Sequence, residues 1–211
     1  MRNVTDRVSN PFDLSPPCER FVPGYGDANA AFHVVGDHPG VHGGLTTGIP
    51  FTDMPWSADF FTALADAGLV DGMPTNDHPV DGTFFSYLHA CDPGETPPSA
   101  AAYADMERFF DAELRAITAH VLLPVGERAT DHVLSTYTAK ADALQRDMDA
   151  LHGTEIRGAG WLVVPIKDPA EWEAGDTERL VEGLRELQRT DFRQTTDLSR
   201  FLADESTYFV R

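Results

Sequence analysis

The chain has 211 residues, which suits a single domain, and its 42% of hydrophobic residues are enough for a substantial core. No apolar run approaches the roughly 18 residues of a membrane-spanning helix, which argues against a membrane protein. Acidic residues outnumber basic ones by 34 to 16, for a formal net charge of -18, and their spread along the whole chain argues against a disordered acidic tail.

This charge predicts an adaptation to salt. Self-repulsion destabilises a compact acidic chain unless counterions screen it, and at roughly 1 M salt the Debye length is only about 3 Å. We therefore expect an intracellular, halophilic protein, with an ordinary acidic protein as the alternative. The first residues, Met1-Arg-Asn-Val-Thr-Asp6, lack the apolar segment of a signal peptide, so we expect the protein in the cytoplasm.

The sequence contains two cysteines, Cys18 and Cys91. Two are too few for a zinc site or a disulfide framework. In a reducing cytoplasm we expect both to be buried thiols.

Four short apolar runs alternate with helical patterns after an irregular arm over residues 1–17. The runs predicted to be strands are Ala31–Val35, Thr83–Leu88, Val121–Val125 and Trp161–Pro165. Helical patterns cover Trp56–Gly68, the stretch from the cap Ser99 to about His120, Thr130–Leu151, a helix from Asp176 or Thr177 to about Arg189, and a short segment within the last twenty residues. This alternation predicts one α/β domain, a three-layer α/β/α sandwich around a four-stranded parallel sheet.

The stretch from Gly36 to Phe51, rich in glycine and histidine, follows the first predicted strand. Ligands of parallel sheets bind beyond the carboxyl ends of the strands, where glycine lets the backbone approach them. Loops at this edge contain Asp37, His38, His42, Tyr87, His89, Arg128, Lys167 and Asp168. The alternative is a tight connection with solvent-facing histidines. Histidines 38 and 42 are a weak metal signal, so we expect no metal there.

Five segments together resemble the uracil-DNA glycosylase superfamily, particularly its fourth and fifth families. They are Gly36-Asp-His-Pro-Gly40, His42-Gly-Gly-Leu-Thr-Thr-Gly-Ile-Pro-Phe51, Leu88-His-Ala-Cys-Asp-Pro-Gly-Glu-Thr-Pro97, Leu123-Pro-Val-Gly-Glu-Arg-Ala129 and Val164-Pro-Ile-Lys-Asp-Pro-Ala170, the last followed by Arg179-Leu180. The resemblance runs from about Cys18 to Arg189 with its landmarks in order. It implies a glycosylase that excises uracil or a related deaminated base from DNA.

The resemblance also implies roles for individual residues. Asp37 would activate water or stabilise the cationic sugar, Lys167 would donate to the departing base, and Phe51 would stack on that base. Residues implied in substrate binding are Gly36, His38, Pro39, Gly40, His42, Tyr87 and Asp168, and those implied in DNA binding are Arg128, Trp172 and Arg179.

The sequence departs from the family pattern at three places. Cys18 and Cys91 match two of the four cysteines that hold an iron-sulfur cluster in these families, so we expect no cluster and no other cofactor. Tyr87 falls at or near the position of the base-reading Asn. The second-motif His falls at Lys167 or Asp168, which leaves the excised base open.

Each predicted site residue also has a structural alternative. Asp37 would then bind backbone amides of its own loop. Phe51 and Trp172 would pack in the core, Arg128 would form a surface ion pair, and Lys167 would be a surface lysine.

Two other functions compete with a DNA glycosylase. One is a family member that has lost catalysis and binds DNA or a protein partner. The other, a small-molecule hydrolase using Asp37 and His38, ranks last because the chain lacks a Gly-x-Ser-x-Gly elbow. The net charge opposes DNA binding at ordinary salt, but this objection weakens in molar salt. We expect a monomer that acts on DNA and not on membranes.

Overall fold

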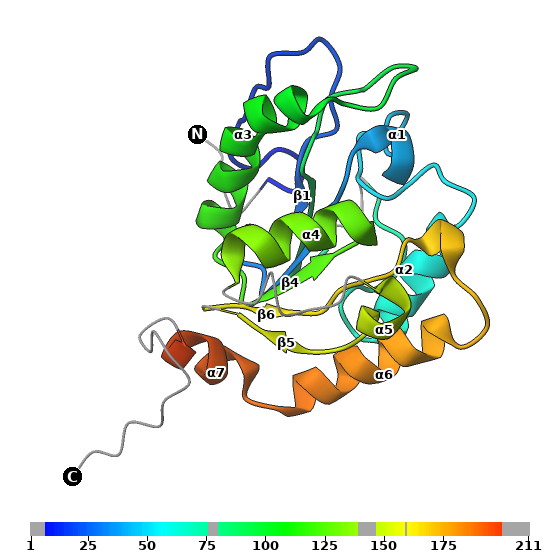
Figure 1. Ribbon diagram of the computed structural model, residues 1–211, viewed down its shortest axis with the longest axis vertical. Helices are drawn as coiled ribbons and strands as arrows, with labels where there is room; N and C mark the ends of the chain where they lie inside the picture. Colours follow the sequence, from blue (N-terminus) through cyan, green and yellow to red (C-terminus); the bar gives the residue numbers. More distant parts are fainter. Residues whose placement is uncertain (1–6, 76–79, 139–146, 159, 200–211) are drawn as a thin grey trace.

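Six strands form one mixed sheet, in the order β1-β3-β2-β4-β6-β5, in a computed structural model that describes residues 7–75, 80–138, 147–158 and 160–199 (Figure 1). The parallel centre consists of β3 (Thr83–Tyr87), β2 (Phe32–Gly36), β4 (Val121–Pro124) and β6 (Leu162–Val163). Two-residue strands, β1 (Tyr25–Gly26) and β5 (Ile156–Arg157), pair antiparallel at the edges. The predicted α/β class and its parallel strands are confirmed. The sheet is wider than predicted because β1 and β5 have two residues each and, unlike β6, do not lie within a longer apolar run.

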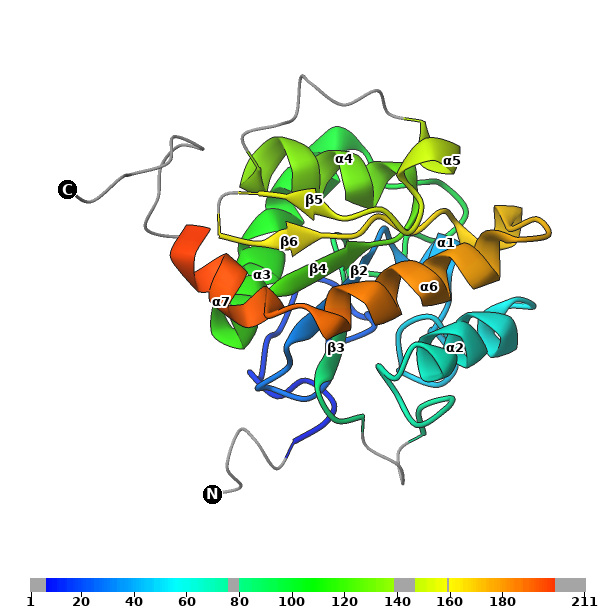
Figure 2. The same ribbon diagram turned by 90° about the horizontal axis from the view of Figure 1, so that it is seen from below.

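Helices cover both faces of this sheet (Figure 2). One face packs against α2 (Ser57–Asp66), α6 (Asp176–Arg189) and α7 (Phe192–Ser199), and the other against α3 (Ala100–Ile117) and α4 (Gly126–Tyr137). Neighbouring residues of β2 pack on opposite faces of the sheet. Val34 lies in the apolar cluster that includes residues of α2 and α6, Val35 lies in the cluster that includes residues of α3 and α4, and neither side chain is exposed. A strand that is buried on both sides explains why this run is continuously apolar.

The helix boundaries confirm some predictions and correct one. Ser99 caps α3 as expected, because its hydroxyl accepts the Ala102 N–H at 3.2 Å. The single helix predicted over Thr130–Leu151 is wrong, since α4 ends at Tyr137, a second short helix follows at residues 148–151, and residues 139–146 lie outside the described ranges. None of the helices in those ranges is long and apolar enough to cross a membrane.

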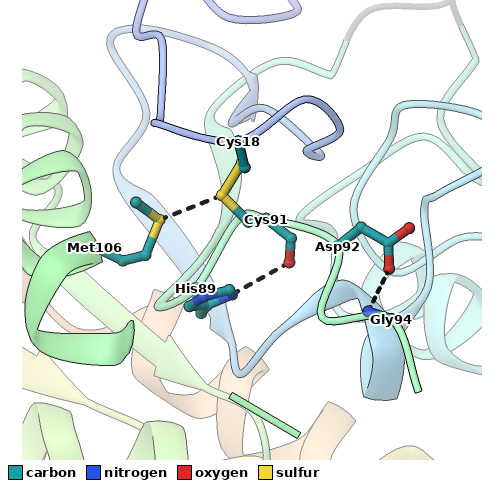
Figure 3. The surroundings of a disulfide bond; sticks show 6 residues. All are labelled: Cys18, His89, Cys91, Asp92, Gly94 and Met106. Atoms are coloured by element: carbon teal, nitrogen blue, oxygen red, sulfur yellow. Dashed lines mark hydrogen bonds between the residues drawn. A yellow bond between two sulfur atoms is a disulfide. The ribbon is translucent and has the colours of Figure 1, made fainter. Parts of the chain in front are cut away.

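A disulfide joins Cys18 to Cys91, so the prediction of two free thiols is wrong (Figure 3). Backbone hydrogen bonds from Val22 to the Ala90 carbonyl and from Asp92 to the Arg20 carbonyl align the N-terminal arm with the segment after β3. This pairing brings the two cysteine Cα atoms to 6.2 Å, within the range that a disulfide spans. Their sequence separation of 73 positions hides this proximity in the sequence.

Candidate active site

A groove of about 460 Å³ lies beyond the carboxyl ends of β2, β4 and β6. Its walls come from α1 (Pro39–His42), the start of α4, α5 (Met148–Leu151) and the 3-10 turn η2 (Pro169–Glu171). The lining residues are Asp37, Val41, His42, Val125, Gly126, Glu127, Arg128, Asp147, Met148, Asp168 and Glu171. Four predicted site residues, Asp37, His42, Arg128 and Asp168, therefore meet in one place although they are far apart in the sequence.

The backbone at the end of β2 determines how the chain enters this groove. A Cβ atom at Gly36 would lie 2.6 Å from the Tyr87 ring, so glycine is required there. The chain then turns into α1, where Pro39 is the first helical residue and the Nδ1 atom of His38 accepts the Gly40 N–H at 3.1 Å. Burial lowers the pKa of His38, which favours this neutral, accepting imidazole. The His38 side chain thus binds the backbone of its own loop, and it is not among the groove-lining residues.

Asp37 lies directly after β2, and two side chains from other elements hold its carboxylate. The Tyr103 hydroxyl donates to Oδ1, and the Arg128 Nε atom lies 3.5 Å from Oδ2. The Arg128 guanidinium also lies over the Tyr103 ring, 4.6 Å from its centroid. Burial and the bond to Asp37 raise the pKa of Tyr103, so its hydroxyl stays a donor. The carboxylate is fixed in position, yet 15% of the Asp37 side chain remains exposed.

The role of Tyr103 was not predicted. It belongs to the first turn of α3 and reaches Asp37 across 66 positions in the sequence. A tyrosine one turn after a helix cap carries no local signal of such a contact.

His42 lies between the backbone of Asp37 and the side chain of Asp168. Its Nδ1 atom accepts the Asp37 N–H at 3.0 Å, and its Nε2 atom lies 3.5 Å from Oδ2 of Asp168. The imidazole stacks on the Phe51 ring, with centroids 5.4 Å apart and planes at 28°. Burial alone would raise the pKa of Asp168, but the His42 imidazole and the Ala170 N–H lower it, so Asp168 stays ionised at neutral pH.

Tyr87 and Phe51 form the floor beneath His42. The Tyr87 hydroxyl accepts the Phe51 N–H at 2.7 Å and donates to the His42 carbonyl at 2.9 Å. This bond holds Phe51 in a left-handed backbone conformation, with φ of 65°, that is rare for an aromatic residue. Phe51 has no exposed surface, and the His42 imidazole stacks on its ring. A base can stack on that ring only if His42 first moves away.

Lys167, Trp172 and Arg179 belong to a separate cluster at the start of α6. The Lys167 ammonium lies 2.6 Å from Asp149 and 3.4 Å from Asp176. Trp172 donates its indole N–H to the Lys167 carbonyl at 2.8 Å, and Arg179 donates to Asp176 at 2.9 Å. The structure therefore does not bring these three residues together with Asp37.

The groove is strongly acidic. Five of its lining residues are carboxylates, Asp37, Glu127, Asp147, Asp168 and Glu171, against the single cation Arg128. Within the described ranges, no group of three or more His, Cys, Asp or Glu side chains is arranged to hold a metal ion. An anion that enters this groove would be repelled by the carboxylates unless salt screens them.

Comparison with known proteins identifies the family of this chain. The model of the Uracil DNA glycosylase superfamily matches residues 23–188. A Type-5 uracil-DNA glycosylase of Pyrobaculum aerophilum is 29% identical over 174 residues, which cover 81% of this chain and 74% of that protein. A Type-5 uracil-DNA glycosylase of Thermus thermophilus is 28% identical over 136 residues, which cover 63% of this chain and 62% of that protein. The chain belongs to the uracil-DNA glycosylase superfamily.

Proposed function

We propose that this protein is a DNA glycosylase that cleaves the N-glycosidic bond of uracil, or of a related deaminated base, in DNA. Family membership and the names of both relatives support this reaction. The observation that carries the proposal is the Asp37 carboxylate, held by Tyr103 and Arg128 at the edge of a groove large enough for a base.

The reaction needs a fixed negative charge beside the sugar. When the bond between C1′ and the base breaks, its electron pair leaves with the base and positive charge develops on the sugar. The Asp37 carboxylate stabilises that charge and accepts a hydrogen bond from the water that attacks C1′. Because Tyr103 and Arg128 already hold it in place, little reorganisation is needed in the transition state.

The substrate has to enter an acidic groove as an extruded nucleotide. Extrusion of a base costs a few kcal/mol, least for a mismatched or single-stranded base. Arg128, 58% of whose side chain is exposed, is the groove cation that is placed to meet a phosphate. The net charge of -18 favours action in molar salt, where the Debye length is only about 3 Å. The protein would act as a monomer, which gel filtration in molar salt tests.

Lys167 has no assigned role in this mechanism. Hydrogen bonds and charges from Asp149 and Asp176 offset desolvation and raise the pKa of Lys167. An ammonium that is held by two carboxylates stabilises the junction of α5 and α6. We therefore propose that the donor to the departing base comes from another residue.

A cleavage assay tests the proposed function. Single-stranded and double-stranded oligonucleotides with one uracil, hypoxanthine or xanthine are incubated with the protein at several salt concentrations. We expect abasic sites to form from uracil, at rates that do not collapse in molar salt. Absence of cleavage from all three bases, with DNA binding retained, would instead favour a binding protein on a glycosylase scaffold.

A further inference from the structure

We propose that His42 and Asp168 form a donor and acceptor pair that reads the –NH–C(=O)– edge of a deaminated base, an inference that rests on the proposed function. In this arrangement the Nε2–H of His42 donates to a base carbonyl. A carboxylate oxygen of Asp168 accepts the neighbouring ring N–H. The pair would recognise the base in place of Tyr87 and Lys167, whose polar atoms bind other groups of the protein in this structure.

The first argument is the tautomer of His42. The Asp37 N–H donates to Nδ1 at 3.0 Å, so a neutral imidazole carries its proton on Nε2. Nε2 is buried and has no hydrogen-bond partner among the described residues, because Asp168 at 3.5 Å is too distant for a good bond. A buried N–H whose nearest acceptor lies 3.5 Å away is poorly paired, and a ligand oxygen at hydrogen-bond distance would pair it better.

The second argument is rigidity. The His42 imidazole lies against Phe51 and Tyr87, with its plane within 28° of each ring. The same Tyr87 hydroxyl fixes the His42 backbone by donating to its carbonyl at 2.9 Å. Asp168 is anchored at one of its two oxygens, because Oδ1 accepts the Ala170 N–H at 2.9 Å. The donor is therefore held in place before any ligand arrives, whereas the acceptor is oriented but keeps some freedom to move.

The third argument is space at Gly126, the residue that begins α4. A Cβ atom built there would lie 3.8 Å from Nε2 of His42 and 3.9 Å from Oδ2 of Asp168. Glycine leaves this volume empty beside both polar atoms, and the groove opens onto it. Asp168 retains 22% of its side-chain surface, so a base edge entering over Gly126 reaches it directly. A small outward shift of Asp168 then admits the neighbouring carbonyl to Nε2.

The fourth argument is chemical complementarity. Uracil, hypoxanthine and xanthine each present a ring N–H beside a carbonyl, which matches one acceptor beside one donor. An ionised carboxylate can only accept, so the ring N–H is the feature that Asp168 reads. A base without that N–H leaves the Asp168 oxygen unpaired, and a site built to bind such a group rejects the analogue that lacks it.

A cycle between enzyme variants and base analogues tests the proposal. Oligonucleotides carry either uracil or N3-methyluracil, which lacks the ring N–H, and single-turnover cleavage is measured for wild type and Asp168→Ala. We expect N3-methylation to slow the wild type by about 10- to 100-fold, the discrimination typical of a paired base contact. Asp168→Ala should slow on uracil by a similar factor and show no further penalty for the methyl group. A full methyl penalty in Asp168→Ala would overturn the pairing.

Two further variants test the role of His42 as the hydrogen-bond donor. His42→Gln retains one acceptor for the Asp37 N–H and one donor, so it should keep part of the preference for uracil over N3-methyluracil. His42→Leu should lose that preference. Glu182→Ala, which removes an exposed α6 carboxylate outside the groove, controls for net charge. Circular dichroism checks the fold of each variant, and equal preference in all of them would contradict the proposal.

Binding separates this inference from the proposed reaction. Oligonucleotides with a 2′-fluorinated sugar resist cleavage, because fluorine destabilises the sugar cation, so their affinity reports recognition alone. Tighter binding of uracil than of N3-methyluracil in wild type, lost in Asp168→Ala, would support the pair even if no base is cleaved. Cleavage of uracil together with equal affinity for both analogues would preserve the glycosylase and refute the pair.

Discussion

The buried carboxyl group of Glu113 predicts that the protein loses stability between pH 6.5 and pH 8. Glu113 lies in α3 with 7% of its surface exposed, and it bonds the Gly24 backbone and the Ser86 side chain. Burial, only partly offset by these bonds, raises its pKa from 4.5 to about 8. The folded protein therefore keeps this proton at pH values where the unfolded chain releases it.

The size of the effect follows from linkage. A raised carboxyl pKa gives stability that is fully present below pH 4.5 and is lost as the pH rises to about 8. Burial lowers the pKa of His33 from 6.5 to about 3, which costs stability as the pH falls below 6.5. The range from pH 6.5 to 8 therefore isolates Glu113. At about 1.4 kcal/mol per pH unit, the expected loss across this range is about 2 kcal/mol.

Urea denaturation at pH 6.5 and pH 8 in molar salt measures this loss. Wild type should lose about 2 kcal/mol of unfolding free energy, and Glu113→Gln, which cannot ionise, should lose less than about 0.5 kcal/mol. The difference between the two proteins removes contributions from every other titrating group. Equal losses in both proteins would show that Glu113 is already ionised at pH 6.5.

Three other properties can be predicted. Reduction of the disulfide between Cys18 and Cys91, or Cys18→Ser, should lower the unfolding free energy by about 4 kcal/mol, because the bond closes a loop of 73 residues; an unchanged urea midpoint would contradict this. Dialysis into low salt should lower the melting temperature, because the net charge is -18, and a salt-independent temperature would reject salt adaptation. Tyr87→Phe leaves the buried Phe51 N–H without its acceptor and should cost about 1–3 kcal/mol in denaturant melts, whereas a neutral effect would mean that Tyr87 does not hold this loop.

The sequence predicts much of the fold because the core strands are continuously apolar. Val34 and Val35 serve opposite faces of the sheet, and such a run stands out from the polar loops on either side. Strands β1 and β5 cannot be found in this way, because each has two residues and neither lies within a longer apolar run. The disulfide is equally hidden, since the bridge between Phe21 and Cys91, which brings the nearby Cys18 within reach of Cys91, exists only in the folded chain.

Only those parts of the candidate site that lie within one local motif could be predicted from the sequence. Asp37 and His42 follow the first strand closely, so their place at the sheet edge follows from the sequence. The orientation of a long side chain does not, and the Lys167 ammonium lies with Asp149 instead of in the groove. Tyr103 comes from a helix 66 positions away, so its bond to Asp37 required the structure.

The central claim is that the Asp37 carboxylate stabilises the cationic sugar and its attacking water. Asp37→Asn retains an acceptor for the Tyr103 hydroxyl but removes the charge. A matched control exists in Asp111→Asn, because Asp111 also accepts a tyrosine hydroxyl, from Tyr137, and lies 3.6 Å from an arginine, but it is not among the groove-lining residues.

Single-turnover cleavage of a uracil-containing oligonucleotide tests this claim most directly. Asp37→Asn should cleave about 100- to 1000-fold more slowly than wild type, as expected when one charge-stabilising group is removed. DNA binding should be retained or improved, because a negative charge near phosphate is lost. Asp111→Asn should cleave at the wild-type rate. Wild-type cleavage by Asp37→Asn would contradict the mechanism.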